Sequence, residues 1–130
     1  MTIQTHDFPD VAGAIRNPGN PHHFMVPQPM TERVRVFVGK DLIADSCDAL
    51  QILEIGSKAY PPRLYLPARD LRSELVQTSR TTHCPLMGHA AYFAHNGAEI
   101  GWTYVVYDFA KVLEGRIAFW SSKVRFEIGG

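Results

Sequence analysis

The sequence predicts a mainly β protein: a compact antiparallel barrel or bent sandwich with short helical turns and an extended N-terminal arm. Three observations predict this class. Short segments alternate apolar and polar residues with the period of a strand, turn residues separate these segments, and the helical stretches are short. A chain of 130 residues is long enough for one core and short for two domains. Many strands and few helices favour this class over a doubly wound α/β sheet.

The predicted strands follow one another through tight turns. Residues 34–38 alternate valine with arginine and phenylalanine, which is the period of a strand. Asn96-Gly97 is the strongest hairpin signal, because both residues tolerate positive φ. Asp70 and Asp108 are expected to cap brief helical turns. In chain order, the predicted strands cover residues 34–38, 42–44, 50–54, 64–66, 89–95, 100–107, 117–120 and 124–128.

Residues 1–31 are expected to form an extended arm, and residues 32–130 a single β domain. The arm holds five of the nine prolines, a composition that cannot sustain a long helix or a central strand. Its first few residues are expected to be loose. Its apolar side chains can be buried against its own domain or against a partner subunit. They are Phe8, Ile15, Phe24, Met25 and Val26.

Composition and charge exclude several classes of protein. Thirteen basic residues balance thirteen acidic ones, so bulk charge gives no support to a nucleic-acid or anionic-membrane partner. No apolar run approaches the roughly 18 residues of a membrane span. The start of the chain lacks the basic and apolar stretches of a secretory signal, which predicts a cytoplasmic protein. Two cysteines exclude a disulfide-rich scaffold, and both are expected to be reduced thiols.

Neither a cofactor nor a metal is predicted. The chain has no glycine-rich phosphate loop, no dinucleotide fingerprint and no esterase elbow. It also lacks the closely spaced cysteine pairs and the H-E-x-x-H helix that mark zinc sites. The adjacent histidines of the arm are expected to be solvated. All side chains weighed as metal ligands are His22, His23, Cys47, His83, Cys84 and His89.

The densest polar cluster covers residues 81–89, in a loop that is expected to enter a strand. Cys84 could act there as a nucleophile if a nearby base or positive charge lowered the pKa of its thiol. His83 adjoins it but points to the opposite face of an extended chain, whereas His89 follows a turn and could approach. Alternatively, Cys84 is a small thiol packed in the core. Asp70 is a helix cap, the partner of an arginine, or an acid in a pocket.

Aromatic side chains gather late in the chain. Trp102 and Tyr104 share one face of a predicted strand, and Tyr92 lies on the facing strand. A flat ligand could stack on this face. The alternative is that these rings are simply core.

These motifs together resemble the bacterial domain-of-unknown-function 427 family, over about residues 34–124. The most specific segment is residues 82–92, which is similar to the family's T-x-C-P-x-K-G-x-A-x-Y run. Met87 stands where the family has lysine. The other matching pieces are residues 34–36, 44–46, 49–50, 53–54, 65–67, 70–71, 102–104 and 115–119.

The resemblance implies a mostly antiparallel fold of the β-tent kind. Some β-tent relatives hold zinc with two C-x-x-C pairs, which this chain lacks, so that metal does not carry over. A lysine at position 87 could lower the pKa of a thiol or bind an anion, and Met87 can do neither. The family is sometimes labelled nucleotidyltransferase-like, but the resemblance implies no established reaction.

We therefore expect a small-molecule-binding β domain with chemistry centred on Cys84. If the protein is an enzyme, Cys84 would be the nucleophile and Thr82 an orienting hydroxyl. Asp70 or His89 would then be the acid or base. The alternative is a structural or interaction module that forms a homodimer through its arm and sheet edges, with nucleotidyl transfer third. The expected pocket is lined by Tyr65, Asp70, Thr82, Cys84, Trp102 and Tyr104.

Overall fold

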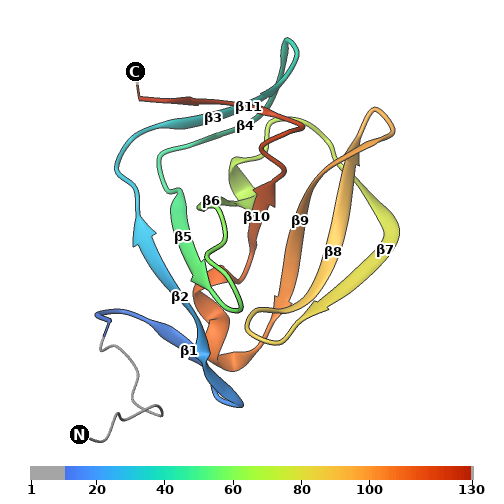
Figure 1. Ribbon diagram of the computed structural model, residues 1–130. Helices are drawn as coiled ribbons and strands as arrows, with labels where there is room; N and C mark the ends of the chain where they lie inside the picture. The colour runs from blue at the N-terminus through green and yellow to red at the C-terminus, as the bar shows by residue number, and fades with distance from the viewer. Residues whose placement is uncertain (1–10, 130) are drawn as a thin grey trace, which may run out of the picture.

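The computed structural model describes residues 11–129, which form two antiparallel sheets (Figure 1). Their strands are β1 Ile15–Asn17, β2 Asn20–Pro29, β3 Val34–Val38, β4 Asp41–Ser46, β5 Leu50–Ile55, β6 Arg63–Pro67, β7 Val76–Cys84, β8 Gly88–His95, β9 Ala98–Val106, β10 Arg116–Phe119 and β11 Arg125–Ile128. The larger sheet has eight strands in the order β1-β2-β5-β6-β10-β9-β8-β7, and the smaller has three in the order β11-β3-β4. Because β1 and β7 stay unpaired with each other, the molecule is a sandwich-like fold and the barrel alternative is not realised.

All eight predicted strands are confirmed, and each begins and ends within two residues of its predicted bounds. The strands β1, β2 and β7 were not predicted. The hairpin is confirmed too. Asn96 and Gly97 have φ values of 49° and 81°, and His95 pairs with Ala98 across the turn. Such two-residue turns with positive φ match the twist of the strands that they join.

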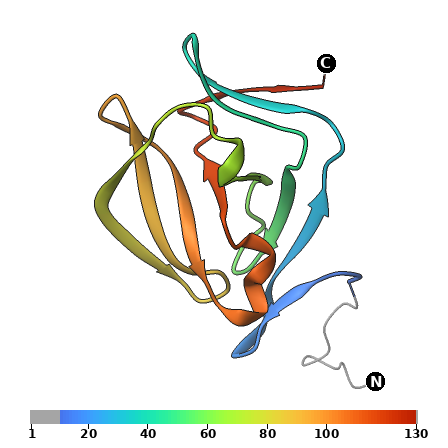
Figure 2. The same cartoon turned by 180° about the vertical axis from the view of Figure 1, so that it is seen from behind.

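The central strands of the larger sheet are buried on both faces. Tyr65 and Leu66 are neighbours on β6, but they belong to two different apolar clusters, and Ala118 and Phe119 divide in the same way on β10. Strands of this kind are nearly continuous apolar runs, as these two are. The small sheet covers one cluster, and the curvature of the large sheet encloses the other (Figures 1 and 2).

The segment expected to be an arm contributes two strands to the large sheet. β2 lies between β1 and β5, so the expectation that this segment holds no central strand is wrong. Met30 donates its backbone N–H to the Ala49 carbonyl, and alternate residues of a strand point the same way. The nitrogens of Pro27 and Pro29 therefore face away from β5, toward the side of β2 where β1 lies. Because β1 pairs with β2 only as far as Met25, no strand lies opposite these two nitrogens, and their lack of an N–H costs no sheet hydrogen bond. Phe8 lies outside the described residues.

Three further expectations are corrected. The polar segment that ends at Cys84 is not a loop but the edge strand β7. Neither acidic residue caps a helical turn: the 3-10 helix η1 (Ala68–Asp70) ends at Asp70, and η2 (Asp108–Leu113) has Tyr107 at its N-cap and no side-chain cap bond. Both helices are short, η2 being two turns joined by a kink at Ala110. No helix in residues 11–129 has the length and apolarity of a membrane span.

Candidate functional site

A cleft of about 420 Å³ opens where the curved sheet brings β2 and β5 opposite the turn between β7 and β8. In both ribbon views the loop after β5 and this turn lie side by side (Figures 1 and 2). We call it the Cys84 cleft. Its lining comes from four separate parts of the chain: β2, the end of β5 with its loop, the β7–β8 turn, and β9. The lining residues are Asn20, His23, Glu54, Gly56, Ser57, Tyr60, His83, Cys84, Pro85 and Tyr104.

One wall of the cleft carries a histidine–carboxylate pair. His23 Nε2 donates a hydrogen bond to Glu54 Oε2 at 2.8 Å. The pair follows from strand register, because Met25 on β2 lies opposite Glu54 on β5 and His23 is two residues further along the same face. The two side chains are only 13% and 19% exposed, so the contact is shielded from bulk water without being sealed from the cleft.

The opposite wall carries the Cys84 thiol, at the end of β7. Burial raises the pKa of Cys84, and backbone N–H groups of Leu86 and Met87 oppose that rise. The neutral thiol is therefore the prevailing form near pH 7. Its sulfur, a ring nitrogen of His23 and a carboxylate oxygen of Glu54 all lie within 4.8 Å of one another.

The β7–β8 turn that presents Cys84 is fixed by a close backbone approach. Gly88, which pairs with Cys84 across the turn, has φ 131°. A Cβ at this position would lie 2.1 Å from the Val105 carbonyl oxygen, so only glycine allows β8 to start this close to β9. Leu86 and Met87 are buried at the tip of the turn and anchor it in the core.

Two tyrosines lie behind the thiol. Tyr104 lines the cleft, and burial raises the pKa of its hydroxyl, as do the neighbouring Tyr65 and Cys84. Tyr65 is 2% exposed and donates to Met87 Sδ at 3.7 Å. Burial raises the pKa of Tyr65 as well, so both hydroxyls stay protonated. Met87 itself is buried in the core beside Tyr65.

Thr82 and Trp102 do not line the cleft. Thr82 Oγ1 shares a hydrogen bond of 2.7 Å with the hydroxyl of Tyr92. Trp102 is 5% exposed and packs against Trp120, with ring centroids 4.3 Å apart. The fold thus places Trp102 and Tyr104 in different surroundings, although they share a strand face.

His89 also lies away from the cleft. It is exposed and pairs with His83 across β7 and β8, with ring centroids 4.8 Å apart. His83, which does line the cleft, makes a second contact through a hydrogen bond with the Tyr107 hydroxyl. His83 rather than His89 is therefore the histidine of this segment that borders the cleft.

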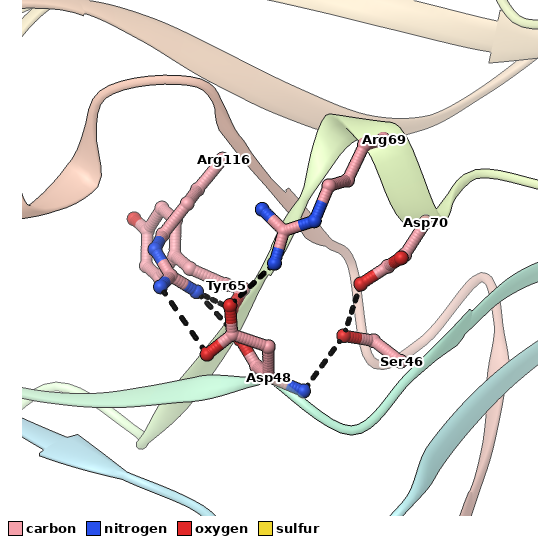
Figure 3. A network of polar contacts seen from close by, with 6 residues as sticks. All are labelled: Ser46, Asp48, Tyr65, Arg69, Asp70 and Arg116. Atoms are coloured by element: carbon pink, nitrogen blue, oxygen red, sulfur yellow. Dashed lines mark hydrogen bonds and ion pairs between the residues drawn. The ribbon is translucent and has the colours of Figure 1, made fainter.

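Asp70 belongs to a separate polar network, drawn in Figure 3. The buried Ser46 hydroxyl donates to Asp70 Oδ2 at 2.7 Å and accepts the Asp48 backbone N–H at 3.0 Å. Arg69 pairs with Asp48 Oδ2 at 2.6 Å. Arg116 donates to the Asp48 and Tyr65 carbonyls at 2.8 and 3.2 Å. The network ties β4, β6, η1 and β10 together.

The fold therefore joins only part of the predicted set. Cys84 and Tyr104 line the cleft and Tyr65 supports it, whereas the remaining four predicted residues lie elsewhere. His23 and Glu54 complete the site. His23 was weighed as a metal ligand but expected to be solvated, which is wrong because its side chain is only 13% exposed, and Glu54 was not singled out from the sequence. The apolar residues after His23 signal that this stretch is buried, but they do not say which strand it pairs with.

The comparisons with known proteins identify a family but supply no activity. Residues 27–130 match the model of a family described as a domain of unknown function (DUF427). No curated protein matches the chain.

Proposed function

We propose that this chain, which belongs to the DUF427 family, binds a small polar molecule in the Cys84 cleft. One observation carries this proposal: polar side chains from four separate parts of the chain converge on one open cleft of about 420 Å³. That volume lies within the range of small-molecule sites, and such sites combine an apolar lining with a few placed polar groups.

The lining indicates what kind of molecule fits. Tyr60 and Tyr104 provide ring surface, while Ser57 and Asn20 add hydrogen-bonding groups. Among the lining residues that the structure describes, neither lysine nor arginine occurs. Phosphate recognition relies heavily on such cations, so the lining argues against nucleotidyl transfer and favours a ligand without phosphate groups.

Any reaction in the cleft would use different partners from those that the sequence suggests. In this proposal Cys84 supplies a protonated thiol, and the His23–Glu54 pair is the acid–base group beside it. Asp70 is committed to Ser46, and His89 lies outside the lining.

The test is a screen of polar fragments by NMR against metal-free protein. We expect hits to perturb the backbone amides of Gly56, Ser57 and Cys84. Tyr104→Phe removes one hydroxyl from the cleft and is expected to weaken such hits about 2- to 10-fold. Tyr92→Phe removes a tyrosine hydroxyl outside the cleft and serves as the matched control. A screen in which no fragment perturbs the cleft would contradict the proposal.

A homodimer is the second candidate, and the edge strand β7 favours it. β7 has a neighbour on one side only, and Val76 is 68% exposed at its start. An edge strand leaves a row of backbone N–H and C=O groups open to pairing with another chain. Light scattering checks this candidate: a dimer that Val76→Lys converts to a monomer supports it, and a monomeric wild-type protein excludes it.

A further inference from the structure

We propose that the Cys84 cleft holds a divalent transition metal of the zinc class, bound by Cys84 Sγ, a ring nitrogen of His23 and a carboxylate oxygen of Glu54. This goes beyond the binding of a polar molecule and does not depend on it. The metal would be bound by the protein alone, whether or not a further ligand occupies the rest of the cleft.

The three donor atoms are already close to the spacing that a zinc ion requires. They lie within 4.8 Å of one another. Ligand atoms around tetrahedral zinc are roughly 3.3–3.8 Å apart, as bond lengths of about 2.0–2.3 Å dictate. To reach this spacing, the two donor atoms that lie farthest apart must approach each other by about 1 Å. Rotation of half-buried side chains at a cleft wall can supply that shift. The hydrogen bond between His23 and Glu54 would open in exchange for two metal bonds.

The chemistry of the donors selects the class of metal. One thiolate, one imidazole and one carboxylate suit zinc and its neighbours in the transition series. Calcium and magnesium prefer shells made of oxygen, which these residues do not offer. On binding, the divalent ion forms a bond to Cys84 sulfur, and the thiol proton leaves to solvent. The neutral His23 ring keeps one proton, on the nitrogen that does not bind the ion. Two negative ligands then neutralise the ion.

Three protein ligands leave a fourth position of a tetrahedral ion unfilled. Structural zinc sites close all four positions with side chains, whereas catalytic sites keep one for water or substrate. Here the three donors sit on the walls of a cleft of about 420 Å³, so the fourth position faces that space. The site is therefore suited to binding an exogenous ligand rather than to stapling the fold.

The cluster is specific within the molecule. Across residues 11–129 no other three histidine, cysteine or acidic side chains bring their donor atoms this close. His83 and His89 face each other without a third donor, and Cys47 is exposed and belongs to no such group of three. Two histidines or a single thiol would hold a metal far more weakly than three converging donors.

The experiment is a titration of the untagged, EDTA-dialysed full chain with cobalt(II), followed by displacement with zinc. We expect one equivalent of cobalt to produce a thiolate-to-cobalt charge-transfer band that zinc removes. Cys84→Ser should abolish this band. His23→Gln and Glu54→Gln should each weaken binding by more than about 100-fold, since even changes outside the ligand shell cost about 10- to 100-fold.

Matched controls come from the same chain. Cys47→Ser and His22→Gln change the other cysteine and the neighbouring histidine, and both should titrate like the wild type. A wild-type protein without the charge-transfer band, or a band that survives Cys84→Ser, would overturn the proposal. Glu54→Gln keeps the shape and the thiol, so it decides the question if Cys84→Ser does not fold, as circular dichroism would report. Fragment binding to metal-free protein is measured separately, so the two proposals can fail independently.

Discussion

The Ser46–Asp70 network and the Cys84 cleft draw on similar polar residues but satisfy them differently. In the network, the Ser46 hydroxyl both donates and accepts, and Arg116 divides its donors between two carbonyl oxygens. In the cleft, the Cys84 thiol lies close to His23 and Glu54 across open space. The network is closed on itself, and the cleft is arranged around a space that another molecule can fill.

This difference separates a structural role from a functional one. A buried polar group that loses its partner pays the full desolvation penalty, so a closed network stabilises the fold through each member. Groups at an open cleft can still be solvated, and their removal costs the fold little. Stability measurements and binding measurements should therefore pick out opposite sets of residues.

The largest effect is expected in the network. Arg116→Ala removes the donor from two carbonyl groups and should lower the free energy of unfolding by about 2–3 kcal/mol. Urea denaturation measures the change. Arg69 pairs with the same aspartate but is 68% exposed, so Arg69→Ala should cost no more than about 1 kcal/mol. Equal losses in the two variants would contradict a special role for the half-buried Arg116.

Cleft substitutions should show the reverse pattern. Tyr104→Phe and Cys84→Ser each preserve shape at a half-buried position, and we expect each to change the free energy of unfolding by less than about 1 kcal/mol. The same variants should bind cleft ligands more weakly. A drop of several kcal/mol for Cys84→Ala would instead identify the thiol as core, because a cavity would remain.

Alkaline pH should sharpen the comparison further. Burial raises the pKa of Cys84 above its ordinary value of 9.0. The stability that follows from this shift is fully present below the unfolded pKa and is lost as pH rises through the folded pKa. In a Cys47→Ser background, alkylation of Cys84 should have its midpoint above pH 9.0. A midpoint below the ordinary value would mean an activated thiolate.

The smallest effect is expected at the surface pair next to the network. Arg33 lowers the pKa of Asp45 through a hydrogen bond and its charge. The stability that this lowered pKa of Asp45 contributes is present above the unfolded pKa of 3.8 and is lost as pH falls through the folded pKa. Because Arg33 is largely exposed, Asp45→Asn should cost about 0–1 kcal/mol at neutral pH. Thermal unfolding at neutral and strongly acid pH should show this difference shrinking with acidity.

The sequence predicts the local features of this fold well. The alternation at Val34–Val38 and the turn at Asn96-Gly97 depend on neighbouring residues only, and both are confirmed. β2 was missed because its prolines suggested a chain without a sheet partner. Pro27 and Pro29 are two residues apart, so both lack an N–H on the same side of β2. Only the position of β5 shows that this side faces away from the neighbouring strand, where no hydrogen bond is lost.

The candidate site could be predicted only in part, and for a related reason. Cys84 stood out as a thiol in a polar segment, and Tyr104 as an aromatic residue on a strand. His23 and Glu54 are 31 residues apart in sequence and meet through strand pairing that no local pattern encodes. Asp70 was wrongly expected in the pocket because its partner, Ser46, lies on β4 of the three-stranded sheet, 24 residues away in sequence.

X-ray absorption at the zinc edge would test most directly whether the cleft is arranged for a ligand. The sample is EDTA-dialysed protein reloaded with one equivalent of zinc. We predict a shell with one sulfur at about 2.3 Å and nitrogen or oxygen neighbours at about 2.0–2.1 Å, and loss of the sulfur in Cys84→Ser but not in Cys47→Ser. A zinc shell without sulfur, or one unchanged by Cys84→Ser, would contradict the assignment of the cleft as the metal site.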